Sequence, residues 1–280
     1  MDLNDSVLRH LREVGARPDL SGTRYELEGE IGRGGIGVVY AARDRELDRR
    51  VAIKVLDAAL AGEARLIARI EHPSIVPVYE RGMLPDGRAW YAMKLVMGAR
   101  LDRHIDGGPS LGERLRVIRR VGEALGFAHS CGVLHRDLKP QNVMVGAFGE
   151  VYVMDWGVQG VAGTPAFRAP EIDSGAARLD ELSDVYALGA MLRFVLPEGA
   201  SAALRAIAGK AMNADRSGRY RDVAAMLADI ERFQDGLAVE AWAEPWWHGM
   251  RRFVARNAVL LWLLGAYAVV KAVLFFARGL

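Results

Sequence analysis

The sequence predicts an α+β chain in which a small strand-rich lobe precedes a larger helical lobe. Short apolar runs rich in β-branched residues, separated by turns, fill the first part of the chain up to residue 97. Beyond Leu111, apolar residues recur at helical spacing over 111–131, 181–196, 200–214 and 220–235. Strands followed by helices in this way are typical of α+β domains.

The first lobe is built from short strands. A polar lead over 1–24, with an amphipathic helix expected around Leu3 to Val14, comes before them. Strands are expected at 25–31, 38–42, 50–56, 76–79 and 90–93, with a helix at 62–70. We therefore place one two-lobed domain over 25–236, with the small lobe at 25–93 and the helical lobe at 97–236.

The composition is that of a folded protein. The 280 residues are 51% hydrophobic and 26% charged, with a net charge of +2. This excludes a disordered chain and fits one or two globular domains. The balanced charge gives no reason to expect a nucleic-acid partner. Cys131 is the only cysteine, which excludes an internal disulfide and a Cys-based zinc site.

The C-terminal segment is strongly apolar. Residues 258–277 are interrupted only by Lys271, and about twenty residues at about 1.5 Å each give roughly 30 Å, the thickness of a bilayer core. Trp246, Trp247 and three arginines directly precede this segment. Tryptophans are common at the membrane–water interface, and positive charges are common on the cytoplasmic side of a transmembrane helix. These features predict a juxtamembrane segment over 237–257 and one transmembrane helix over 258–277. The lobes would then lie in the cytoplasm, at the inner membrane.

A buried or dimerising helix is the alternative for 258–277, because a lysine inside a span is costly. Lys271 is close enough to Arg278 for its side chain to reach the far interface. Gly265 and Ala266 could also allow close contact with a second copy, so a homodimer stays open. The start of the chain, Met1 to Asp5, is not a signal peptide, since it has neither a basic start nor an apolar run.

Two segments carry groups suited to phosphoryl transfer. Residues 135–142 read His-Arg-Asp-Leu-Lys-Pro-Gln-Asn, and residues 155–157 read Asp-Trp-Gly. Together they offer two carboxylates, a lysine and a carboxamide. Phosphoryl transfer needs one group that orients the attacking hydroxyl and oxygen ligands for the Mg²⁺ ions that bridge the phosphates.

A glycine-rich stretch precedes a strand that contains a lysine. Residues 32–37 place glycines at positions 32, 34, 35 and 37. A dinucleotide-binding version of this pattern would open a helix, whereas Val38 and Val39 follow here, and no Gly-Lys-Ser/Thr occurs. The pattern predicts a hairpin whose backbone N–H groups can approach phosphates. Lys54, at the end of Val-Ala-Ile-Lys, strengthens this interpretation against an ordinary hairpin turn.

Taken together, these motifs resemble those of the bacterial eukaryotic-like (Hanks-type) serine/threonine protein kinases. The resemblance implies a two-lobed protein-kinase fold over 25–236. It also implies ATP and Mg²⁺ as cofactors, with Mn²⁺ as a possible substitute for the metal. The expected reaction transfers the γ-phosphate of ATP to serine or threonine hydroxyls of a protein substrate.

The resemblance assigns a role to each motif residue. Asp137 would orient the substrate hydroxyl, and Lys139 would neutralise charge on the transferred group. Lys54 would hold the α- and β-phosphates and pair with Glu63, which could alternatively be a surface residue of an amphipathic helix. Asn142 and Asp155 would bind the metal. The nucleotide-binding residues implied are Gly32, Gly34, Gly35, Gly37, Val39, Ala52, Lys54, Met93, Lys94, Val96 and Met144.

Three further residues have structural roles by the same resemblance. Glu171 is expected to form a buried ion pair with Arg219. Asp184 is expected to hold the backbone of the catalytic segment.

Three departures from the family pattern shorten regulatory and docking parts. Only residues 55–62 separate Lys54 from Glu63, so the helix that carries Glu63 is short. Only residues 158–162 lie between the Asp-Trp-Gly motif and Gly163, and Thr164 is the only hydroxyl residue between Asp155 and Glu171. The substrate-docking helix expected before residue 202 is missing.

Two other functions remain as alternatives to an active protein kinase. The shortened segments favour a catalytically weak, pseudokinase-like scaffold that binds nucleotide, but the intact Lys54, Asp137, Asn142 and Asp155 oppose it. A small-molecule kinase is the third candidate. The stretch 163–171 opposes that reading, because it resembles the segment with which protein kinases accept a polypeptide.

Overall fold

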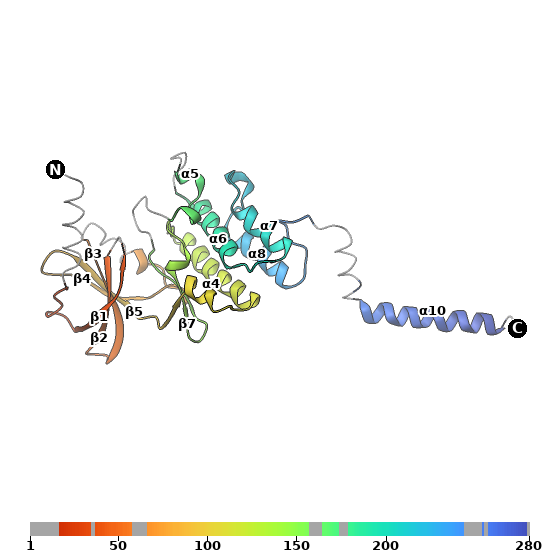
Figure 1. The fold of residues 1–280 in the computed structure, drawn as a ribbon, viewed down its shortest axis with the longest axis horizontal. Coiled ribbons are helices and arrows are strands. Elements are labelled where there is room, and N and C mark those ends of the chain that lie inside the picture. The colour runs from red at the N-terminus through yellow and green to blue at the C-terminus, as the bar shows by residue number, and fades with distance from the viewer. Residues whose placement is uncertain are drawn as a thin grey trace.

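The two predicted lobes are present. The computed structural model describes residues 17–34, 37–57, 66–156, 164–173, 179–243, 254 and 257–278. Figure 1 shows the strand-rich lobe on the N-terminal side, the helices beyond it, and the C-terminal helix α10 apart from both. The predicted α+β arrangement is therefore confirmed.

A five-stranded antiparallel sheet forms the small lobe, in the order β1-β2-β3-β5-β4. The strands are β1 (Tyr25–Gly34), β2 (Gly37–Asp44), β3 (Arg49–Leu56), β4 (Val78–Met83) and β5 (Ala89–Lys94). Their β-branched and aromatic residues pack into one apolar core, where the rings of Tyr25 and Trp90 meet edge to face at 5.5 Å.

A second, smaller sheet follows at the start of the helical lobe. It consists of β6 (Gly98–Arg100), β7 (Val143–Gly146) and β8 (Val151–Val153), in that order. The 3-10 helix η2 (Pro140–Asn142) leads directly into β7. Sequence reasoning expected helix beyond Leu111 and missed these strands. They matter for function, because Asn142 directly precedes β7 and Asp155 follows β8. The pairing of these two strands therefore brings Asn142 and Asp155 close together.

Helices make up most of the second lobe. They are α3 (Leu101–Asp106), α4 (Leu111–Ser130), α5 (Pro170–Asp173), α6 (Glu181–Val195), α7 (Ala202–Ala211) and α8 (Val223–Gln234). Helix α4 starts at a capping box between Ser110 and Glu113 and buries one apolar face against α6 and α8. The predicted helices agree with α4, α6, α7 and α8 to within a few residues. Residues 196–201 alone connect α6 to α7, so the predicted lack of a docking helix is confirmed there.

The helical lobe continues past its predicted end at residue 236. Val239 is buried in the core, and Trp242 packs against it. The buried Asp229 of α8 accepts hydrogen bonds from the backbone N–H groups of Glu240 at 2.6 Å and Ala241 at 2.9 Å. The first residues of the predicted juxtamembrane segment are thus part of the folded lobe.

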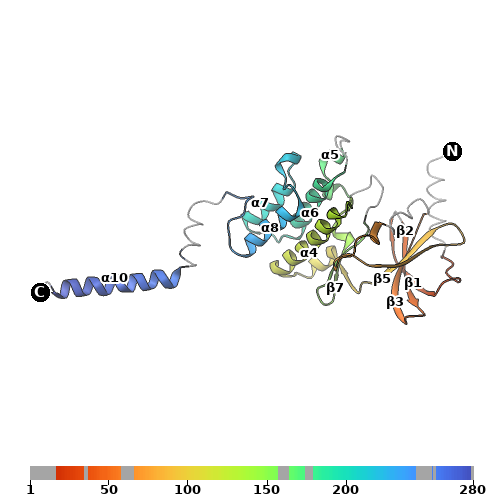
Figure 2. The same cartoon turned by 180° about the vertical axis from the view of Figure 1, so that it is seen from behind.

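Helix α10 (Ala258–Arg278) covers the segment predicted to span a membrane and lies apart from the lobes in both views (Figures 1 and 2). Among the described residues, however, no helix has the combined length and apolarity needed to cross a bilayer. The structure therefore does not support the predicted transmembrane helix over 258–277. Lys271, near Tyr267 in this helix, is the kind of residue that makes a span costly.

The amphipathic helix predicted for the lead lies outside the described residues, as does the first part, 62–65, of the helix expected at 62–70. In the described remainder, Leu66 and Ile67 are helical, and a turn follows them.

Candidate active site

A cleft of about 720 Å³ separates the five-stranded sheet from the helical lobe. Most residues that the sequence singled out line it: Gly32, Gly34, Gly37, Val39, Ala52, Lys54, Met93, Lys94, Val96, Asp137, Lys139, Asn142, Met144 and Asp155. Gly35 and Glu63, predicted for the same site, lie outside the described residues. The fold thus brings residues from distant parts of the chain to one place, while their chemical roles stay predictions.

The glycine-rich hairpin of β1 and β2 borders the cleft. Gly34 pairs with Gly37 at its end. A Cβ on Gly37 would lie 2.2 Å from the carbonyl oxygen of Val55 on β3, so only glycine fits there. Gly32 and Gly34 have open space where a Cβ would stand, which leaves their backbone accessible to phosphate oxygens.

Lys54 connects the small lobe to the segment after β8. Its side chain is buried, and its Nζ lies 2.8 Å from Oδ1 of Asp155. Burial alone would raise the pKa of the Asp155 carboxyl, but the charge and hydrogen bond of Lys54 outweigh this and hold the pKa below its usual value. Asp155 is therefore a carboxylate at neutral pH. Its φ of 59° is in the left-handed region that residues other than glycine rarely adopt.

The Asp137 carboxylate is surrounded by donors from its own segment. Its Oδ2 accepts hydrogen bonds from Lys139 Nζ at 2.7 Å and from Asn142 Nδ2 at 3.3 Å. Asn142 Nδ2 also donates to the backbone carbonyl of Asp137 at 2.7 Å. Because the nitrogen of the Asn142 amide faces Asp137, its Oδ1 is left as an acceptor that a cation can use.

The imidazole ring of His135 holds the backbone next to Asp137 through hydrogen bonds. The ring is fully buried, and its Nδ1 accepts from the backbone N–H of Asp137 at 3.3 Å. Its Nε2 therefore carries the proton and donates to the Met154 carbonyl at 3.0 Å. Burial lowers the pKa of His135, so the ring is neutral. It packs against Trp156, with 4.8 Å between the ring centroids.

Asp184 in the first turn of α6 holds the backbone of the same segment. Its carboxylate accepts from the backbone N–H of His135 at 2.9 Å and of Arg136 at 3.1 Å. His129 Nε2 lies 2.8 Å from the same carboxylate. The predicted role of Asp184 is confirmed. Its contacts also hold Arg136 at a φ of 73°, a second left-handed residue beside the cleft.

Glu171 and Arg219 form the predicted buried ion pair. Two parallel hydrogen bonds of 2.7 Å each join the guanidinium to the carboxylate. Arg219 also donates to the carbonyls of Asn213 and Leu182. Sequence reasoning missed Arg216, whose guanidinium adds a third contact to Glu171 at 3.0 Å. The cluster anchors the segment that follows Thr164 to the helical lobe.

Residues 25–203, which include the small lobe, the cleft and the helical lobe up to the start of α7, match the family model described as "Protein kinase domain". The chain belongs to the protein kinase family. The resemblance to serine/threonine protein kinases is likewise confirmed by known relatives.

Three of these relatives come from mycobacteria. A serine/threonine-protein kinase PknB of Mycobacterium leprae is 33% identical over 281 residues, covering 80% of this chain and 45% of that protein. PknB of Mycobacterium tuberculosis (strain H37Rv) is 34% identical over 276 residues, covering 78% and 44%. PknJ of the same strain is 35% identical over 218 residues, covering 66% and 37%. The chain therefore spans less than half the length of these curated relatives.

The donor set of this kinase-family cleft suits Mg²⁺ that arrives with a nucleotide. Asn142 and Asp155 flank the β7–β8 hairpin, where Val143 pairs with Val153 and the N–H of Met154 donates to the carbonyl of Asn142 at 2.9 Å. In the described part of the chain, no group of three or more His, Cys, Asp or Glu could hold a metal by itself. Mg²⁺ commonly takes one or two side-chain oxygens and completes its shell with phosphates and water. The residues present therefore fit this ion.

The Lys94 side chain, at the end of β5, connects the small lobe to β8 of the second sheet. The backbone N–H of Lys94 donates to Pro77 at 3.2 Å, and its Nζ donates to the hydroxyl of Tyr152 on β8. The hydrogen bond to Tyr152 raises the pKa of Lys94. The predicted backbone contact of Lys94 with adenine stays a prediction.

Gln141 is the lining residue that sequence reasoning should have found. It stands between Pro140 and Asn142 in the motif already singled out, and its buried Oε1 has no hydrogen-bond partner among the described residues. Other lining residues that were missed are Ile31, Arg33, Ala41, Arg50, Leu95, Met97, Arg100 and Met154.

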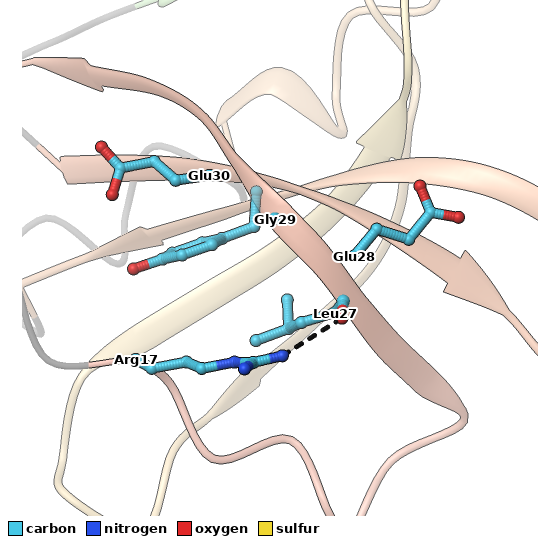
Figure 3. Close-up of a pocket in the computed structure, with 6 residues that line it drawn as sticks. Arg17, Leu27, Glu28, Gly29 and Glu30 are labelled. Carbon is cyan, nitrogen blue, oxygen red and sulfur yellow. Dashed lines mark hydrogen bonds between the residues drawn. The ribbon is translucent and has the colours of Figure 1, made fainter.

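A second, smaller hollow of about 260 Å³ lies over β1 (Figure 3). Figure 3 shows Glu28 and Glu30 flanking Gly29, with Arg17 donating to the carbonyl of Leu27 at 3.3 Å. Each carboxylate already has a cationic partner: Arg50 lies 2.7 Å from Glu28, and Arg33 lies 2.6 Å from Glu30. We assign this hollow no ligand.

Proposed function

We propose that this chain is a serine/threonine protein kinase that transfers the γ-phosphate of ATP to protein hydroxyls. The observation that carries the proposal is the convergence of Lys54, Asp137, Asn142 and Asp155 on one cleft. Catalysis of phosphoryl transfer depends mainly on positioning and on charge stabilisation, and these residues supply both.

Each residue has a task that its surroundings support. Asp137 orients the substrate hydroxyl and accepts its proton, and the neighbouring Lys139 stabilises negative charge on the group in transfer. Lys54, held at the cleft by Asp155, contacts the α- and β-phosphates. Asn142 and Asp155 offer oxygen atoms to Mg²⁺, which would neutralise charge on the phosphates when bound.

The direct test uses the purified full-length chain with γ-labelled ATP and a generic protein substrate. We expect label on serine or threonine side chains with Mg²⁺, and none when EDTA removes the metal. Nucleotide binding without any transfer would favour a pseudokinase-like scaffold. Label on a small metabolite alone would favour a small-molecule kinase.

We also infer, from the sequence, that the C-terminal helix attaches the chain to the inner membrane with both lobes in the cytoplasm. The side chains of Val259, Trp262, Tyr267 and Val269 are 60% exposed or more, a large apolar surface for a helix in water. The space around Gly265 would let two copies of this helix approach closely, which supports a homodimer.

Removal of this helix should release the protein from membranes. We expect the full-length chain to pellet with membranes and a chain stopped at Glu244 to stay in the supernatant, because burial of apolar surface drives the attachment. Resistance of the pelleted protein to carbonate would indicate a spanning helix, and extraction would indicate a surface helix. A full-length chain that fractionates as soluble protein without detergent would contradict the attachment.

We further propose that activation does not require phosphorylation of the loop after Asp155. The sequence offers one hydroxyl there, Thr164, and a connection so short that ordering it costs little conformational entropy. Arg136, the cation that would pair with a loop phosphate, is exposed beside the cleft. Control would then act through the short segment that carries Glu63 or through clustering at the membrane.

Early kinetics should show this independence. Phosphatase-treated protein should transfer phosphate from its first turnovers without a lag, with phosphorylation sites mapped by mass spectrometry. A Thr164→Val variant should likewise transfer phosphate without a lag, even if its steady rate is lower than that of the wild type. A lag that ends as a phosphate accumulates on Thr164 would contradict the proposal.

A further inference from the structure

A lysine and a tyrosine join the two sheets beside the cleft. Lys94 is the last residue of β5, and its Nζ donates a hydrogen bond to the hydroxyl of Tyr152 on β8. The same ammonium group lies 4.6 Å from the centroid of the tyrosine ring. Lys94 lines the cleft, and Tyr152 is buried. We call this contact between Lys94 and Tyr152 the lysine tether.

On the small-lobe side, Lys94 is the last residue that the five-stranded sheet holds. It pairs with Val51 of β3, and its backbone N–H donates to the carbonyl of Pro77 at 3.2 Å. Residues 95–97 follow without regular secondary structure and lead into β6. All three of them line the cleft. The backbone orientation at Lys94 therefore determines how this short connection borders the cleft.

On the other side, Tyr152 stands on a strand that is itself held in place. It pairs with Met144 of β7, and residues directly opposite each other in an antiparallel pair place their side chains on the same face of the sheet. Met144 lines the cleft. The next residue of β8, Val153, donates its backbone N–H to the carbonyl of Ser74 at 2.8 Å. The Tyr152 side chain is therefore held next to a residue that lines the cleft.

The lysine tether and the covalent connection reach opposite edges of the second sheet. That sheet has the order β6-β7-β8, so residues 95–97 enter it at β6, whereas the tether holds β8. A hydrogen bond from a charged donor is stronger than one between neutral groups, and the raised pKa of Lys94 keeps its ammonium group protonated. Two attachments at separate edges restrict the backbone torsions of the connection more than the chain alone does.

We propose that Tyr152 is a positioning residue for the nucleotide, because through Lys94 it holds residues 94–97 in the orientation that binds adenine. This inference rests on the proposed kinase function and adds a determinant of nucleotide affinity to it. A segment that is ordered before the nucleotide arrives loses less conformational freedom on binding, so the affinity is higher. Tyr152 acts through Lys94 and takes no part in the transfer itself.

The test separates the adenine end of the nucleotide from its phosphates. Titration calorimetry with the full-length chain measures the dissociation constants of MgATP, of adenosine and of magnesium tripolyphosphate, which has the phosphates without adenine. Tyr152→Phe removes the hydroxyl and keeps the ring. It should weaken binding of MgATP and adenosine roughly fivefold, less than one direct hydrogen bond to a charged group contributes, because the tether acts on the nucleotide indirectly. Binding of tripolyphosphate should not change.

Further variants make the test specific. Lys94→Met breaks the same contact, so the double variant with Tyr152→Phe should bind adenosine no more weakly than the weaker of the two single variants. Lys210→Met is the matched control. The Nζ of Lys210 lies 4.5 Å from the ring centroid of Tyr220 in the helical lobe, and neither residue lines the cleft, so its nucleotide affinity should equal that of the wild type. Melting temperatures, measured alongside, check that every variant is folded.

Three outcomes would overturn this role of Tyr152. Unchanged adenosine affinity in Tyr152→Phe would show that the hydroxyl positions nothing. Losses that add up in the double variant would show that the two side chains act separately. An equal loss for tripolyphosphate would indicate a general weakening of the cleft. A wild type that binds adenosine and MgATP but transfers no phosphate would overturn the proposed function alone, and a wild type that binds neither would overturn both.

Discussion

Asp137→Asn and Asp155→Asn should each lower phosphoryl transfer at least about a hundredfold while the chain stays folded. The first change removes the carboxylate that accepts the proton of the substrate hydroxyl. The second removes the charged oxygen offered to Mg²⁺. Both keep the size of the side chain, and asparagine tolerates the left-handed backbone that Asp155 adopts.

Initial rates under matched MgATP, with circular dichroism melting as the check on folding, measure this effect. Asp235→Asn is the matched control, since Asp235 lies exposed at the end of α8, and its rate should equal that of the wild type. Near wild-type turnover by either active-site variant would remove the basis for assigning kinase activity to this cleft.

Arg219→Met should lower the free energy of unfolding by about 3–5 kcal/mol, because the buried Glu171 carboxylate loses its bidentate ion pair with the guanidinium. The variant also loses the hydrogen bonds from Arg219 to two backbone carbonyls. Urea denaturation gives the difference directly. Arg221→Met is the control, and it should change stability by less than about 0.5 kcal/mol because its side chain is 86% exposed.

The same ion pair should make the stability depend on pH in acid. Burial alone would raise the pKa of Glu171. The hydrogen bonds to its carboxylate and the charge of Arg219 outweigh burial, so the pKa of Glu171 lies below the usual 4.5. The unfolded chain therefore takes up this proton first as the pH falls below about 4.5, and stability decreases until the native carboxyl also titrates. Glu171→Gln should show a shallower loss of stability over that window. An identical pH profile for wild type and Glu171→Gln would show that the pair does not contribute as described.

The convergence of the motif residues on one site was predicted from the resemblance to protein kinases. The pairing that brings two of them together was not: Asp155 follows β8, which pairs with β7 directly after Asn142. The short apolar runs rich in β-branched residues predicted the strands around Lys54. Glu171 and Arg219 were paired correctly from a resemblance, since no local pattern links residues so far apart in sequence.

The parts that were missed depend on non-local contacts. Strand β6 exists because Gly98 lets its backbone approach β7, where a Cβ would stand 2.1 Å from the carbonyl oxygen of Val145. Strand β6 has three residues and no apolar pattern, so its pairing with β7 could not be predicted from the sequence. Arg216 reaches Glu171 only because the 3-10 helix η4 (Arg216–Gly218) presents it beside Arg219. The β7–β8 hairpin, with its apolar triplets around a turn at Gly149, did carry a readable signal.

The most direct test of the cleft's function is the fate of the γ-phosphate in a single turnover. Full-length protein in excess over labelled MgATP, with an unlabelled protein substrate present, is quenched at short times and analysed for ADP, free phosphate and phosphorylated side chains. We predict close to one phosphoserine or phosphothreonine for each ADP formed. Bound ATP that stays intact, or ADP that forms only with free phosphate, would contradict the assignment of protein-kinase chemistry to Asp137, Lys139, Asn142 and Asp155.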